Sequence, residues 1–101
     1  MGTEHDAALK AVCDFVASAG GNTWVTHQNA RVQGTPGAPD MSLVLPTQGG
    51  RGPLGFAFME VKVGEDTLSP EQIAFKVRVE DAGVLVVVGR AADLADAFGY
   101  S

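Results

Sequence analysis

The sequence predicts a single α+β (α/β) domain in which a central mixed β-sheet is flanked by helices. Two observations lead to this fold class. Residues 4–19 and 69–82 have the apolar spacing and the terminal residues that are typical of helices. Residues 41–45 and 84–88 are short apolar runs of the length expected for buried strands. The chain of 101 residues has the length of one domain, residues 1–101, with a modest core.

The N-terminal third predicts one helix, one strand and a loop. The helix covers residues 4–19, with Thr3 as its N-cap and two glycines directly after it. A strand is predicted over residues 23–28, and its Trp24 is assigned to the core. Residues 29–40 are rich in glycine and proline, which favours a loop over a regular element.

The middle of the chain predicts a hairpin followed by a helix. Residues 41–45 and 56–63 are strands joined by a glycine-rich turn region, for which an antiparallel hairpin is the simplest connection. The next helix covers residues 70–82, because Ser69 can cap it and Gln72 completes a capping box. These elements place a long strand next to a well-defined helix start.

The last quarter of the chain predicts a strand and a short closing helix. Residues 84–88, VLVVV, show no alternation of polar and apolar side chains, which indicates a strand buried on both faces. Residues 91–100 form the closing helix. The order helix, strands, helix, strand, helix completes the pattern of a mixed sheet with helices around it.

Composition restricts the kind of protein. Hydrophobic residues make up 46% and charged residues 19%, the balance of a globular domain. No segment approaches the ~18 apolar residues of a membrane span, and the acidic, amphipathic N-terminus is not typical of a targeting signal, so we expect no membrane association and a cytoplasmic location. Cys13 is a lone cysteine, which excludes an internal disulfide. The net charge of -5 argues mildly against nucleic acid as a partner.

An acid and a base occupy one face of an otherwise apolar strand. In GFAFMEVKVG, residues 55–64, alternate side chains share a face, so Phe56, Phe58, Glu60 and Lys62 point the same way. Acids and lysines two positions apart are usually part of a solvated face. The two phenylalanines favour the other interpretation, in which this face begins buried and the charges belong to a site.

A second acid can join the first across the hairpin. If the hairpin is symmetric about Gly50, Asp40 lies opposite Glu60, and directly opposed side chains are roughly 4.5–5.5 Å apart at Cβ. Two carboxylates at that distance repel unless a proton or a cation lies between them. A Mg²⁺ ion takes one or two carboxylates and keeps several waters, so it would satisfy the pair.

The segments GAPDMSLVLP, FMEVKVG and LSPEQIAF resemble the core of the PD-(D/E)XK nuclease superfamily, and most closely its VRR-NUC group. This group consists of small nuclease domains that occur alone in phages and bacteria and are fused to larger repair enzymes. The resemblance covers about residues 34–88 and implies a restriction-endonuclease-like core. The Glu-x-Lys element alone occurs in many proteins, and its spacing from the Pro-Asp and Ser-Pro-x-Gln elements makes it specific.

The resemblance implies a metal-dependent phosphodiesterase and a role for each matching residue. Asp40 and Glu60 would hold one or two Mg²⁺ or Mn²⁺ ions, together with the backbone carbonyl of Val61. Lys62 would orient the attacking water and stabilise charge on the scissile phosphate. Gln72 would lie at the edge of the site.

The family often adds a glutamate from the first helix, and Glu4 fits this role. Glu4 lies at the border of the apolar side of that helix, whereas Asp6 faces the polar side. Acids in a first turn are also stabilised by the helix dipole alone, so both explanations of Glu4 stay open. His5 lies within the apolar side and is interpreted as a packed histidine rather than a base.

Three basic residues are predicted to contact DNA. Arg31 and Arg51 occupy loops assigned to either side of the site, and Lys76 lies one helical turn after Gln72. Each could touch a phosphate, although a solvated side chain is the simpler explanation for any one of them alone.

Two functions of different classes follow from the resemblance. The first is a divalent-metal-dependent DNA endonuclease that cuts branched DNA, such as a Holliday junction or a flap, in the cytoplasm of a bacterial or phage-infected cell and in the context of DNA repair. A homodimer would place two active sites on two strands. The alternative is a catalytically weak or inactive DNA-binding or interaction module of the same fold. The presence of Asp40, Glu60 and Lys62 together favours the enzyme.

Overall fold

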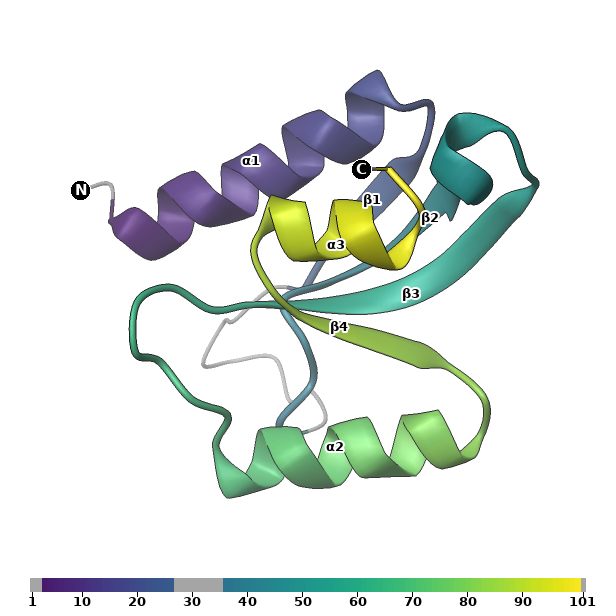
Figure 1. Ribbon diagram of the computed structural model, residues 1–101. Coiled ribbons are helices and arrows are strands. Elements are labelled where there is room, and N and C mark those ends of the chain that lie inside the picture. Colours follow the sequence, from purple (N-terminus) through teal and green to yellow (C-terminus); the bar gives the residue numbers. More distant parts are fainter. Residues whose placement is uncertain (1–2, 27–35, 101) are drawn as a thin grey trace.

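The computed structural model describes residues 3–26 and 36–100, and within them a four-stranded mixed sheet (Figure 1). The spatial order is β1-β2-β3-β4, which is also the order along the chain. The neighbours β1/β2 and β2/β3 are antiparallel, and β3/β4 is parallel. The predicted α+β class with a central mixed sheet is confirmed. The strands are β1 (Asn22–Val25), β2 (Met41–Pro46), β3 (Leu54–Val61) and β4 (Leu85–Gly89).

The helices cover the two faces of the sheet unequally (Figure 1). The helices α1 and α3 contact each other and the sheet, and α2 packs mainly against β4 from the opposite face. None of the helices in the described residues is long and apolar enough to cross a membrane. The helical elements are α1 (Glu4–Ser18), η1 (Gln48–Gly50), α2 (Pro70–Asp81) and α3 (Ala91–Ala97).

The hydrophobic core lies between the sheet and the pair α1 and α3. Alternate residues of β2 and β3 point into it because side chains in a strand alternate between faces. Their neighbours point to the α2 side, where Glu60 lies. The strict alternation in the hairpin therefore separates a dry core face from the face that carries the acids. The buried core residues of β2 and β3 are Met41, Leu43, Leu45, Ala57, Met59 and Val61.

The α2 face of the sheet is less covered than the sequence predicted. Phe58 packs edge-to-face on Phe75 of α2, with ring centroids 5.3 Å apart. Phe56 is 46% exposed, so the prediction that this face begins buried is wrong at Phe56. Trp24 is 52% exposed, and its assignment to the core is also wrong. Trp24 lies on the edge strand β1, which α2 leaves open because it packs mainly on β4. Phe56 lies near the start of β3, before the part of that strand that pairs with β4.

Each strand differs from its predicted range at one end or both, and one strand is buried only in part. The strand β3 ends at Val61, so Lys62 follows the strand rather than lying within it. The strand β1 ends at Val25, and the rest of the predicted strand falls largely outside the described residues. In β4, Val86 and Val87 are buried on opposite faces, whereas Leu85 is exposed because β4 is an edge strand.

The start of α2 has the predicted capping box. The Ser69 hydroxyl accepts from the Gln72 backbone N–H at 3.2 Å, and the Gln72 side-chain oxygen accepts from the Ser69 N–H at 2.8 Å. Pro70 follows directly, where its missing N–H costs nothing. The capping box fixes the position and rotamer of Gln72, which then points its amide toward the sheet.

Candidate active site

The β2–β3 hairpin brings the two predicted acids together. Its ladder pairs Met41 with Met59 and Ser42 with Phe58, so the next opposing positions are those of Asp40 and Glu60. This register is the one predicted from a hairpin symmetric about Gly50. Both acids therefore lie at the open end of the hairpin, where β2 begins and β3 ends.

Asp40 is held by its own backbone and by its side chain. Its carbonyl oxygen accepts from the Thr26 N–H at 2.7 Å, and its Oδ2 accepts from the Val61 N–H at 2.8 Å. The preceding Pro39 is buried. Gly37 approaches the main chain of α2 so closely that a Cβ would collide with the Glu71 carbonyl. These contacts explain why a short glycine- and proline-rich segment precedes the acid.

Glu60 is a buried carboxylate with an incomplete set of partners. Its side chain accepts at Oε2 from Gln72 Nε2, at 2.8 Å, and the residue is only 5% exposed. Its Oε1 is buried and has no hydrogen-bond partner among the described residues. Burial, which is the largest cause, and the nearby charge of Asp40 together raise the pKa of Glu60 to about 7, against the opposing effect of Lys62. The pair therefore favours a proton or a cation between its members.

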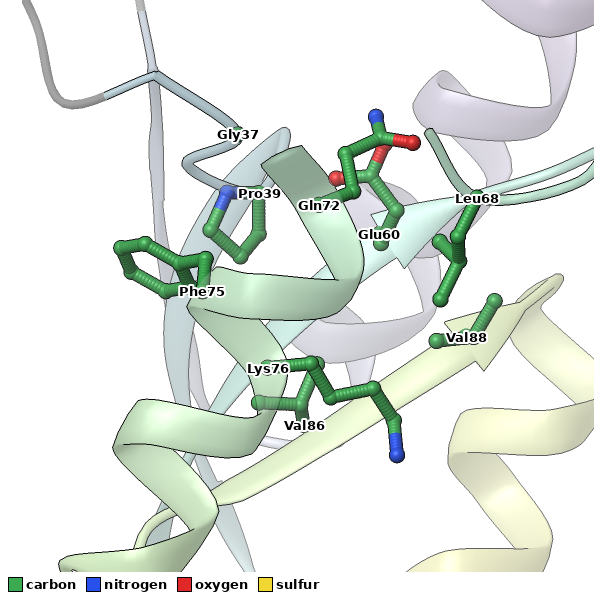
Figure 2. Close-up of a pocket in the computed structure, with 9 residues that line it drawn as sticks. All are labelled: Gly37, Pro39, Glu60, Leu68, Gln72, Phe75, Lys76, Val86 and Val88. Carbon is green, nitrogen blue, oxygen red and sulfur yellow. The ribbon is translucent and has the colours of Figure 1, made fainter. Parts of the chain in front are cut away.

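Gln72 joins the acid to the lysine. Its Nε2 donates to Glu60, and its Oε1 accepts from Lys62 Nζ at 3.1 Å. Lys62 Nζ also lies 3.8 Å from Glu60 Oε2. Figure 2 shows the Gln72 amide directly beside the Glu60 carboxylate. The amide thus orients both charged groups, and the ammonium group stays next to the acid pair.

A small cavity lies beneath this network (Figure 2). Its volume is about 10 Å³, which is the size of a single water molecule. The cavity is too small for a nucleotide, so a ligand of that size or larger would have to approach the acids from the solvent side. Its lining residues come from four parts of the chain and are mostly apolar, and they include Pro39, Leu68, Phe75, Val86 and Val88.

His5 is a site residue that the sequence interpretation missed. Its Nε2 lies 3.2 Å from the Val61 carbonyl oxygen and 3.4 Å from Asp40 Oδ2. The helical wheel correctly predicted that this side chain points inward, but the interpretation as a packed histidine omitted the contacts of its ring with polar atoms of the site. The missing information was where the first turn of α1 lies relative to the end of β3.

The other predicted residues lie away from the acid pair or outside the described residues. Glu4 binds Arg90, with Oε2 2.7 Å from Nη2, and its side chain is 68% exposed. Lys76 pairs with Glu80 at 3.0 Å, and it also lines the cavity under Glu60. Arg31 falls outside the described residues.

Arg51 does not flank the site. It follows η1 in the turn of the β2–β3 hairpin, whereas the acids lie at the hairpin's open end. Six strand residues separate the two ends, which corresponds to about 20 Å. The prediction that it lies in a loop beside the site is therefore wrong, because neighbouring loops in the sequence connect opposite ends of the same strands.

The donor set fits a hard divalent cation. Asp40, Glu60 and the Val61 carbonyl would supply oxygen ligands, and the buried Glu60 Oε1 has no hydrogen-bond partner among the described residues. Within residues 3–26 and 36–100 no group of three or more His, Cys, Asp and Glu side chains is arranged to hold a metal. An ion here would thus use two carboxylates and keep several waters, as Mg²⁺ commonly does.

An α+β fold with two acids and a lysine at the open end of its hairpin defines a nuclease-type domain. The sequence profile of the VRR-NUC domain matches residues 3–93, and the chain belongs to this family. A solved structure described as a VRR_NUC domain is 27% identical, with a TM-score of 0.68, and the match covers 95% of this chain and 94% of that chain. No match was found among curated proteins. The predicted family is confirmed.

Proposed function

We propose that this VRR-NUC domain is a divalent-metal-dependent DNA endonuclease that hydrolyses phosphodiester bonds. The observation that carries the proposal is the buried Glu60 carboxylate, whose Oε1 has no partner among the described residues and which lies beside the carboxylate of Asp40. A structural carboxylate in this position would be expected to complete its hydrogen bonds. A carboxylate that binds a cation would leave one oxygen without a hydrogen bond when the cation is absent.

Asp40, Glu60 and the Val61 carbonyl are the groups that would hold Mg²⁺ or Mn²⁺. Such an ion supplies Lewis-acid chemistry at a phosphate and lowers the pKa of water. Glu4 is a further ligand only if it releases Arg90.

The chain's own contribution to the chemistry centres on Lys62. Its ammonium group is fixed by Gln72 and lies beside Glu60, so it presents a positive charge where a phosphate would meet the acid pair. A preorganised charge of this kind stabilises the negative charge that develops on a phosphoryl oxygen. Gln72 keeps the ammonium group and the carboxylate in a fixed relation to each other.

The substrate we propose is structured or branched DNA. The sequence contains no helix rich in Arg, Asn and Gln that would read base edges, so recognition depends on shape and backbone. A chain of 101 residues has a small footprint, and a homodimer would place two sites on two strands of a junction. Light scattering at micromolar concentration tests the dimer, and a monomer mass would contradict it.

The alternative function is a binding module that has lost turnover. A degenerate site is expected to lose at least one of its charged groups, whereas Asp40, Glu60 and Lys62 lie together here. The enzyme is therefore the better-supported proposal.

A cleavage assay separates the two functions. Flap, junction and plain duplex DNA, with an RNA duplex alongside, are incubated with Mg²⁺ or Mn²⁺ and wild-type protein. Lys62→Ala and Glu60→Ala should each lower the cleavage rate by a factor of at least ~10². Lys10→Ala is the matched control, because Lys10 is an exposed lysine on α1 that pairs only with Asp14 among the described residues. Cleavage that persists in Lys62→Ala would assign the activity to another site or to a contaminant.

A further inference from the structure

The first turn of α1 contacts both strands of the hairpin at the acid pair. Its His5 reaches the last residue of β3, Val61, and the residue before β2, Asp40. In Figure 1 the N-terminal end of α1 lies at the side of the sheet where β3 ends. These are the points where the β2–β3 ladder stops, so the backbone hydrogen bonds of the ladder no longer fix the two groups.

We infer that His5 is a positioning residue, which fixes the Val61 carbonyl and the Asp40 carboxylate as a pair of ligands for the cation. This inference rests on the proposed function and adds a residue to its machinery. It is based on the contacts among three groups, the His5 ring, the Asp40 carboxylate and the main chain of Val61, each of which contacts the other two. The ring Nε2 lies 3.2 Å from Val61 O and 3.4 Å from Asp40 Oδ2, and the Val61 N–H donates to the same Oδ2 at 2.8 Å.

The partners of the ring decide where its hydrogen lies. Both neighbours of Nε2 are acceptors, a carbonyl oxygen and a carboxylate oxygen, so Nε2 has to carry the hydrogen and donate. A nitrogen that donates has no lone pair for a metal ion, so Nε2 is not a ligand in this arrangement. It holds the atoms that would be ligands.

The contacts with His5 leave room for an ion. A carbonyl oxygen has two lone pairs, so the Val61 carbonyl can accept from His5 and still bind a cation. Both described contacts of the Asp40 carboxylate use Oδ2, which leaves Oδ1 available on the part of the chain that the structure describes. Groups that orient metal ligands from behind commonly act in this way, and their loss costs 10–100-fold in affinity or activity.

The test measures Mn²⁺ binding by calorimetry on the full chain without DNA. His5→Leu removes the donor at similar volume and should weaken Mn²⁺ binding by about 10–100-fold. His5→Gln keeps an N–H near the position of Nε2 and should bind Mn²⁺ close to the wild-type affinity. His5→Asn is polar, but its side chain is too short to reach Val61 O and Asp40 Oδ2, so it should also weaken Mn²⁺ binding by about 10–100-fold. This variant keeps the test decisive if His5→Leu folds poorly.

Two further variants separate the possible causes. Arg90→Gln breaks another polar contact that joins the start of α1 to the rest of the domain, the pair with Glu4. If Arg90→Gln weakens Mn²⁺ binding as much as His5→Leu does, the effect is a loosened helix and the inference is overturned. Asp40→Asn should abolish Mn²⁺ binding, and if it does not, the cation site itself is wrong and the proposed function fails with it.

The direction of the change in Mn²⁺ affinity also tests the role of His5. If Asp40→Asn abolishes binding while His5→Leu and His5→Asn bind as the wild type does, only the role of His5 is overturned. Tighter binding in His5→Leu would mean that the ring competes with the ion for the carbonyl, which likewise overturns it. Weaker binding in both His5→Leu and His5→Asn, with His5→Gln near the wild type, supports it.

Discussion

Replacing Glu60 by glutamine is expected to stabilise the metal-free protein at pH 8 and to change its stability little at pH 4.5. Burial and the charge of Asp40 raise the pKa of Glu60 from 4.5 to about 7. Between these values the folded protein keeps a proton that the unfolded chain releases. Stability therefore falls as the pH rises from 4.5 to 7, and above 7 the loss is complete. A glutamine in the same place cannot ionise and avoids this loss.

The size of the effect follows from the shift in pKa. A rise from 4.5 to about 7 corresponds to about 3 kcal/mol of destabilisation of the folded state above pH 7, at 1.36 kcal/mol per pKa unit. For a domain of this size that is a difference in Tm on the order of 10 °C. This figure is an upper limit, because the ion pair with Lys62 is lost in the variant.

Thermal unfolding in a chelator at pH 4.5 and pH 8 provides the measurement. The difference in Tm between Glu60→Gln and wild type should be large at pH 8 and small at pH 4.5. Glu65→Gln is the matched control, because Glu65 is an exposed glutamate in the loop after β3 and its replacement should give the same small change at both pH values. A Glu60→Gln variant that is no more stable than wild type at pH 8 would refute the reasoning from burial and repulsion.

Three further predictions concern the metal, the helix cap and the approach to Asp40. Mg²⁺ should raise the Tm of the wild type at pH 8 more than that of Glu60→Gln, because it binds only the folded acid pair; equal rises would place the ion elsewhere. Ser69→Ala should cost about 1 kcal/mol in a urea titration and keep DNA cleavage, since only the cap is lost. Gln72→Leu removes the cap and the contacts with the acid and the lysine, so it should also lose cleavage, and equal cleavage by these two variants would argue against a role for the amide. Gly37→Ala should lower both Tm and Mn²⁺ affinity, because its φ is +81° and a Cβ would collide with the main chain of α2. Gly64→Ala, with φ +58° and open space around it, is the control, and an equal loss in Tm would show that backbone strain alone is responsible.

The register of the acid pair could be predicted from the sequence because the alternation of side chains and a hairpin symmetric about Gly50 together specify it. Alternating side chains fix which residues of β2 and β3 face the core, and a shift by one position would turn Met59 outward. The glycines of the turn allow a compact connection, in which Gly49 and Gly50 have positive φ. The capping box at Ser69 and Gln72 is equally local. Because these features are local, the sequence alone predicted that the two acids, the lysine and the amide belong to one site.

The wrong predictions concern contacts between elements that are far apart in the sequence, and local sequence patterns do not determine such contacts. The contact of His5 with Val61 joins residues far apart in the sequence and depends on how α1 crosses the sheet. The position of Arg51 depends on which end of the strands its loop connects. Trp24 has the character of a core residue, but β1 is an edge strand that α2 does not cover. Periodicity predicts which way a side chain points, and tertiary packing decides what it meets.

The helix α2 contains no fully buried residue, and its described ties to the sheet include Phe75 on Phe58 and Gln72 on Glu60. One amide therefore serves both the proposed activity and the packing of a whole helix on the sheet. A library sorted only for folded, abundant protein would retain this glutamine even in an inactive domain. Its retention in a relative is for this reason poor evidence of activity, whereas retention of the lysine, which caps nothing, is good evidence.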